Sequence, residues 1–339
     1  MRRLLGVELL RFRSRRAMKV MCIGSLLLVV FIMFVQFLTH TKSDGSEVER
    51  FRANRAASYE QARTQLTDQL AQLENDPNFP PAELERMRSR VDSVTREQYL
   101  AGQDFSCDDC RQSPGTDDYN AASDMKEGVK AIGFIFAFAA FLVGATAAGA
   151  EWNHGTMQSL LFWESRRVRV ILAKVAAVVI SMVAVAALAQ LVGHALSVLV
   201  GKLRGTTAGM TSGWWQSQVI TTGRGLGLVA FAAALGFALA FATRNTGFAF
   251  GVAFVYFAII QQLLVGWKPW LIRYVLIGPM AAWMNNGFRE EIGGRNGPNG
   301  EWIPNIVSMS ARYGGFALLI YAVVAVALAA AWFRARDVT

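Results

Sequence analysis

The sequence predicts an all-α integral membrane protein with six membrane-spanning helices. Hydrophobic residues make up 53% of the 339 residues, above the roughly 45–50% of an ordinary soluble domain. They are concentrated in six runs of about 20 residues, a length that crosses a hydrocarbon layer about 30 Å thick. Lys and Arg crowd the segments at one side of these runs, as they do in cytoplasmic loops.

The first 17 residues predict a cytoplasmic amphipathic helix ahead of span one, 18–38. Within "MRRLLGVELLRFRSRRAMKV", Leu4, Leu5, Leu9 and Phe12 repeat at helical spacing, and arginines fill much of the rest. A basic helix with an apolar face lies on an anionic membrane surface. The apolar run that follows is too long for a signal peptide and no small-residue cleavage site follows it, so we expect an uncleaved span.

Five further spans, within 128–339, complete the predicted topology. An even number of spans places both termini on one side, which the charge rule makes the cytoplasm of a plasma-membrane protein. The basic residues near 166–169, Arg244 and Arg334 then fall on that side too. The five runs are Gly128–Ala150, Val170–Val200, Val219–Ala242, Thr246–Gly266 and Arg312–Phe333.

Residues 39–127 form a large loop that this topology places outside the cell. It holds 11 Lys and Arg against 18 Asp and Glu, a net charge of −7. Leu66, Leu70 and Leu73 share one helical face, and the pattern resumes from Leu84 after "NDPNFPPAE". Because prolines favour the start of a helix, we expect a helical hairpin.

Residues 267–311 form the other external region. The stretch 267–284 is apolar and rich in Trp, but it contains Lys268, Pro269, Arg273 and Pro279. A seventh span here would move the C-terminus outside, against the charge rule. We therefore expect a re-entrant or surface-lying segment before span six.

Cys107 and Cys110 form a C-x-x-C pair in the outer loop. Such a pair can be redox-active, half of a zinc site, or a disulfide. No second Cys pair and no βαβ pattern accompany it. A local disulfide is the expectation for an extracellular loop, with metal binding as the alternative.

Sequence motifs exclude several other classes of function. The net charge of +9 fits the membrane surface rather than nucleic acid, since no RNA-binding or zinc-finger motif is present. No phosphate-binding G-x-x-x-x-G-K-[ST] loop occurs, so this chain does not hold nucleotide by that mechanism. Glu151 and His154 have the spacing of a di-iron helix bundle, but the second pair that such sites need is missing.

Span three carries a polar face. Gln190, His194 and Ser197 lie at i, i+4 and i+7. They either hydrogen-bond between helices or line a path for a substrate. The sequence leaves both interpretations open.

The polar stretch 151–169, "EWNHGTMQSLLFWESRRVR", separates spans two and three. Gly155 can end one helix in a left-handed conformation, and Thr156 can cap the next through its hydroxyl. Met157, Leu160 and Leu161 then form an apolar edge that can pack into a groove on a soluble partner.

This stretch resembles the cytoplasmic loop of the permeases of type-2 ABC exporters. The matching residues are Glu151, Gly155, Thr156, Leu160, Leu161, Ser165, Arg166 and Lys174, while Glu164 stands where relatives have a proline-containing break. The amphipathic N-terminus, six spans and the region before span six fit as well.

The resemblance implies a non-catalytic permease subunit that exports an amphipathic or hydrophobic substrate. Two copies of a separate ATPase would dock on 151–165, carrying ATP-Mg, and this chain would bind no cofactor. A second permease copy, identical or different, and membrane lipid complete the expected partners. The alternatives are a membrane regulatory or assembly protein whose outer hairpin binds an extracellular partner, and a membrane-embedded enzyme.

Overall fold

The computed structural model describes residues 2–14, 16–40, 45–74, 84–86, 88–89, 119–153, 167–207, 209–296 and 302–335. These residues form two compact units. Unit 1 comprises 1–34, 122–199 and 208–339, and unit 2 comprises 35–121 and 200–207.

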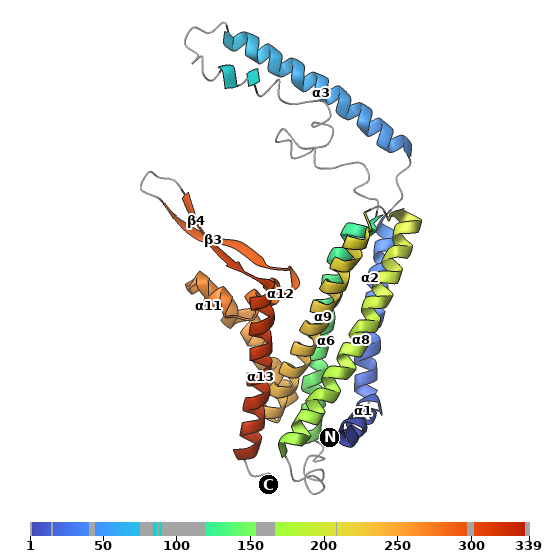
Figure 1. Ribbon diagram of the computed structural model, residues 1–339, viewed down its shortest axis with the longest axis vertical. Helices are drawn as coiled ribbons and strands as arrows, with labels where there is room; N and C mark the ends of the chain where they lie inside the picture. Colours follow the sequence, from blue (N-terminus) through green and yellow to red (C-terminus); the bar gives the residue numbers. More distant parts are fainter. Residues whose placement is uncertain are drawn as a thin grey trace. The chain divides into compact units, whose positions relative to one another are not determined.

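The six predicted spans are confirmed as helices long and apolar enough to cross a membrane. They are Met18–Thr39, Ala121–Trp152, Val168–Arg204, Ser212–Thr243, Thr246–Trp267 and Ala311–Ala335. They belong to the helices α2 (Arg16–Thr39), α6 (Ala121–Asn153), α8 (Arg167–Arg204), α9 (Ser212–Thr243), α10–α11 (Thr246–Trp267) and α13 (Ala311–Ala335). The amphipathic helix α1 (Arg2–Ser14) precedes them. In unit 1, α1 lies beside the ends of α6 and α8 that flank residues 154–166 (Figure 1).

Side-chain caps begin both α9 and α10, and a tight link joins the two helices. The Thr211 hydroxyl accepts a hydrogen bond from the Trp214 amide at the start of α9. At its end Arg244 adopts a left-handed φ of 57°, and the Asn245 side chain then accepts from the Phe248 amide to start α10. Each cap satisfies a helix-end amide that would otherwise lack a partner.

Helices α6 and α9 pack backbone to backbone through two glycines. A Cβ added at Gly144 would lie 2.3 Å from the Ala233 carbonyl oxygen, and one added at Gly236 would lie 2.2 Å from the Phe141 carbonyl oxygen. Small residues permit such close approach of helices in membranes, where packing rather than the hydrophobic effect drives association. Phe136, Leu228 and Met182 fill the core around this contact.

The outward faces of the spans remain apolar. Phe138, Val219 and Phe254 are each about two-thirds exposed. In water such faces would cause aggregation, whereas the hydrocarbon layer solvates them. The described part of the chain is therefore built for a bilayer.

The fifth span contains a π-helical turn, and irregular structure follows the span. Helix α10 (Thr246–Val255) passes through a π-helical turn, Tyr256–Ile260, into α11 (Gln261–Trp267). The 3-10 helix Pro269–Arg273 and the helix α12 (Ile277–Met284) follow. Helix α12 packs closely on α13, because a Cβ added at Gly314 would lie 2.5 Å from the Pro279 carbonyl oxygen.

The sequence did not predict the strands between α12 and α13. β3 (Phe288–Asn296) and β4 (Trp302–Met309) pair antiparallel, from Phe288 opposite Met309 to Asn296 opposite Trp302. The register shifts between Glu291 and Gly294, where Gly293 has a φ of 66°. The described residues are thus not all helical: an antiparallel strand pair lies within the region expected to be external.

Unit 2 contains the helix α3 (Gly45–Glu74) and a short parallel bridge. Strand β1 (Tyr119–Asn120) pairs with strand β2 (Gly205–Thr206). The His40 ring meets the Tyr119 ring edge-on at 5.4 Å. Residues 84–86 and 88–89 are helical, and Arg88 forms an ion pair with Glu74. The rest of the expected second hairpin arm lies outside the described residues.

Candidate functional site

A buried ion cluster lies at the end of unit 1 where the 154–166 segment leaves α6 and enters α8. The Lys174 Nζ atom is 2.8 Å from Glu151 Oε2 and 3.0 Å from Glu8 Oε1. The three residues are 3%, 6% and 8% exposed, respectively. One lysine therefore joins α1, α6 and α8.

Each helix places its member of the cluster by simple periodicity. Glu151 stands in the last turn of α6, and Lys174 stands about 10 Å along α8 from its start at 1.5 Å per residue. Glu8 is on the same face of α1 as Phe12, one turn later, and Phe12 packs against the core. The amphipathic face of α1 therefore delivers both an apolar anchor and a carboxylate.

The surroundings of the cluster are tightly packed. Glu8, Phe12, Glu151, Lys174 and Phe237 border a cavity of only about 20 Å³, hardly more than one water molecule needs. Arg11 adds a partly exposed contact, 3.3 Å from Glu8. Lys174 thus contacts both carboxylates, and Arg11 contacts Glu8 as well.

Such a cluster is costly to break. Removing one partner of a buried ion pair costs about 3–5 kcal/mol, because the remaining charge is left uncompensated. Glu8, Glu151 and Lys174 are all buried, so water hydrates the remaining charge poorly. The cluster consequently holds the ends of three helices in one register.

An aromatic cluster fixes the other side of the same end. The Trp152 ring lies 5.6 Å from the Phe241 ring of α9 and 5.9 Å from the Phe333 ring of α13. Phe241 and Phe333 are themselves 5.1 Å apart, edge to face, a favoured aromatic geometry. The Arg244 guanidinium lies 4.4 Å from the Trp152 ring centre, within cation–π range. Residue 154 therefore follows a helix end that is clamped from both sides.

The predicted coupling residues divide between the described and the undescribed parts of the chain. Glu151 is in place, and its motif partner Lys174 contacts it directly. The other predicted coupling residues lie outside the described residues: Gly155, Thr156, Met157, Leu160, Leu161, Ser165 and Arg166. Their role stays a prediction.

Glu8 is the residue that sequence reasoning missed. It is the single acidic residue among the first 20, which otherwise carry only basic charge. That isolation sets Glu8 apart in the sequence, but arginines on the same helix could already pair with it. Its partner, however, is 166 positions away along the chain.

The polar residues of span three make contacts between helices. The Gln190 amide donates to the Val129 carbonyl of α6 at 3.0 Å, and the Ser197 hydroxyl lies 3.5 Å from the Met33 sulfur of α2. His194 stacks on Trp215 of α9 with ring centres 6.2 Å apart. Gln190 and Ser197 are buried. These are contacts of the interhelical kind, and the substrate-path interpretation stays a prediction.

The cysteine pair and the histidine of the Glu151–His154 pair lie outside the described residues. Cys107, Cys110 and His154 lie in the undescribed segments. Within the described residues, no group of three or more His, Cys, Asp and Glu side chains is arranged to hold a metal ion.

Six membrane-length helices with a charge cluster at one end define a multi-pass membrane protein. The model of the ABC-2 family transporter proteins matches residues 112–260. Over these residues the chain is similar to the ABC-2 transporter permeases, which confirms the resemblance drawn from the 151–169 stretch. The match extends from before α6 into the π-helical turn after α10. No curated protein matches the chain.

Proposed function

We propose that this chain is the permease subunit of an ABC exporter, energised by a separate ATPase that docks on residues 151–165. Two ATPase copies serve two permease copies, and the substrate is amphipathic or hydrophobic. The single observation that carries the proposal is the Glu8–Lys174–Glu151 cluster. It joins three helices at the point where the docking segment begins and ends.

The cluster holds the ends of α1, α6 and α8 together, so that force applied at the docking segment moves them as one body. An ATPase that closes on ATP pushes on the docking segment, residues 151–165. Glu151 and Trp152 fix the end of α6 that leads into this segment, and α8 begins after it. Because Lys174 ties α8 to α1 and α6, the three helices move together rather than separately. A push at the docking segment is thereby delivered to spans two and three as a tilt.

The side of the membrane follows from charge. The cluster end of unit 1 also holds Arg244 and Arg334, and the first helix is strongly basic. Under the positive-inside rule this end is cytoplasmic. Both termini and the docking segment then face the ATPase, and residues 39–127 face outward.

The segment 269–284 re-enters the membrane beside span six. Tyr321 lies ten residues into α13, about 15 Å along its axis, and its hydroxyl donates to the Tyr274 carbonyl at 2.8 Å. Gln261 accepts a hydrogen bond from the Ile277 amide, and the Tyr256 hydroxyl accepts one from the Leu276 amide. Irregular backbone is tolerated at membrane depth only where such partners exist.

Docking is tested by co-expression with the ATPase. Genes for an ATPase and its permease are co-expressed and the permease is purified by a tag. We expect Glu151→Lys and Gly155→Pro to abolish ATPase recovery, whereas Glu127→Gln, at an exposed position at the start of α6, leaves it unchanged. Normal recovery and ATP turnover in both loop variants would overturn the docking proposal.

A further inference from the structure

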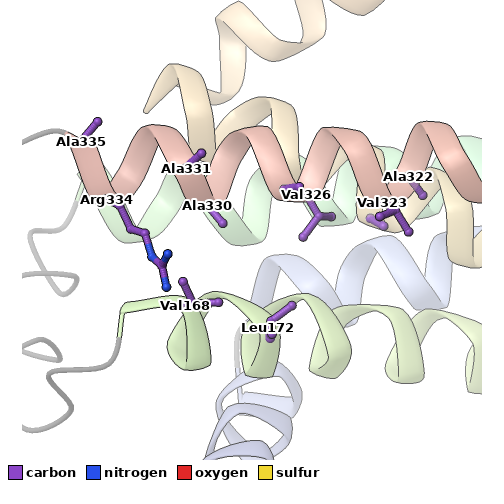
Figure 2. A pocket seen from close by; sticks show the side chains of 11 residues that line it. Val168, Leu172, Ala322, Val323, Val326, Ala330, Ala331, Arg334 and Ala335 are labelled. Atoms are coloured by element: carbon purple, nitrogen blue, oxygen red, sulfur yellow. The ribbon is translucent and has the colours of Figure 1, made fainter.

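An apolar groove runs along the last four turns of α13, opposite the start of α8. It has a volume of about 810 Å³, within the range of ligand pockets. Figure 2 shows its walls, which are almost entirely alanine and valine. From α13 come Ala322, Val323, Val326, Ala327, Ala330, Ala331, Arg334 and Ala335, and the opposite wall is formed by Val168, Leu172 and Ala234.

The groove matches one membrane leaflet in length. Residues 322–335 of α13 extend over about 20 Å at 1.5 Å per residue, and one leaflet with its headgroups is half of a bilayer about 40–45 Å thick. It extends to the end of α13 that carries the last-turn arginine. Its axis therefore follows the direction in which an acyl chain of that leaflet lies.

Charge is confined to one end of the groove. Among the described residues that line it, Arg334 alone is charged. Its guanidinium extends from α13 across the groove mouth toward Val168 (Figure 2). This cation is placed where the headgroups of the leaflet lie, while the rest of the lining offers methyl groups to the hydrocarbon depth.

We infer that the groove binds an anionic phospholipid, with one acyl chain along α13 and the phosphate on Arg334. A guanidinium binds phosphate oxygens through paired hydrogen bonds, and the alanine–valine walls accept an acyl chain without losing any polar contact. A second copy of the chain is a poorer occupant. A helix about 10 Å across and 20 Å long displaces roughly 1,600 Å³, twice the volume of the groove.

The bound lipid lies between α8, which the proposed function moves, and α13. Val168 and Leu172 belong to the first turns of α8, just before Lys174. The lipid therefore contacts the helix that leaves the docking segment on one side and α13 on the other. The site stands independently of the ATPase, because it depends on the groove and on Arg334.

Native mass spectrometry of the full-length protein released from nanodiscs tests the inference. Nanodiscs contain phosphatidylglycerol or phosphatidylcholine, and the adducts per chain are counted. We expect one retained phosphatidylglycerol, and an affinity about tenfold lower in Arg334→Gln, the loss expected for a hydrogen bond to a charged group. Arg312→Gln, at the opposite end of α13, is the matched charge control.

A second variant tests the acyl chain. Ala327 is exposed and lines the groove, so Ala327→Phe fills it without entering the core. Val324→Phe adds bulk to the same helix outside the groove. We expect phosphatidylglycerol retention to fall in the first variant and not in the second, with both proteins eluting as folded particles in size exclusion.

Three results would overturn the inference. One is equal retention of phosphatidylglycerol by wild type and Arg334→Gln. Another is equal retention of phosphatidylcholine and phosphatidylglycerol by the wild type. The third is an Ala327→Phe protein that changes its oligomeric state while keeping its lipid, which would assign the groove to a second copy.

Discussion

Replacing Lys174 with Met tests the ion cluster most severely. The side chains are similar in length, so packing is largely kept, but Glu8 and Glu151 lose their shared buried cation. With both carboxylates less than one-tenth exposed, the expected cost is about 3–5 kcal/mol. The unfolding entropy of about 2.1 cal/mol/K per residue converts this into a Tm about 4–7 °C lower.

Two further variants turn this loss into a decisive comparison. Lys202→Met makes the same change near the other end of α8, where the lysine is exposed, and we expect its Tm to match the wild type. The triple variant Glu8→Gln, Glu151→Gln, Lys174→Met removes all three charges and should recover most of the loss, because neutral replacement of a buried ion cluster is often tolerated. Thermal unfolding in detergent, followed by circular dichroism, measures all of them. Equal Tm values for Lys174→Met and Lys202→Met would refute the reasoning.

Two more predictions concern the packing of α6 on α9 and the segment 273–284. Gly144→Leu should prevent folding, because its Cβ would overlap the α9 backbone. Gly223→Leu should fold, since no atom of the described residues lies within 4 Å of that Cβ position. The yield of monodisperse protein in size exclusion distinguishes the two variants, and equal yields would contradict the contact assigned to Gly144. Gln261→Leu removes the acceptor for a backbone amide of α12 and should speed hydrogen exchange in residues 273–284. Gln262 is the exposed neighbour, so Gln262→Leu should leave exchange unchanged. Unchanged exchange in both variants would contradict the role given to Gln261.

The spans were predictable because their signal is local. A run of about 20 apolar residues identifies a membrane helix without reference to any other part of the chain, and all six runs agree with the helices observed. The ends were less predictable. Helix α6 begins at Ala121, before the apolar run starts at Gly128, because polar residues continue a helix once it has formed.

Contacts between distant elements were not predictable from local patterns. Glu151 and Lys174 were both noticed as parts of one motif, yet their shared partner Glu8 depends on how α1 folds back. The glycines that permit close helix packing were not predictable from local patterns either. Gly223 and Gly251 have a neighbour-free Cβ position among the described residues, whereas Gly144 and Gly236 make the close helix contact.

The β3–β4 hairpin lacked a usable signal as well. Its first strand contains two adjacent glycines, Gly293 and Gly294, and its second contains Pro304. Glycine and proline are both depleted in strands. Pairing between the two strands, and the bulge near Gly293, override these weak local preferences.

The variant Glu8→Gln shows whether the ion cluster transmits ATP-driven motion to the spans. This change leaves the Lys174–Glu151 pair in place and frees only α1 from it. The variant is reconstituted with its ATPase in vesicles, and ATP turnover is measured with and without candidate lipids and amphipathic drugs. Stimulation should fall to the basal rate while ATPase recovery stays normal, with Glu127→Gln as control. Full stimulation in the Glu8→Gln complex would contradict the account.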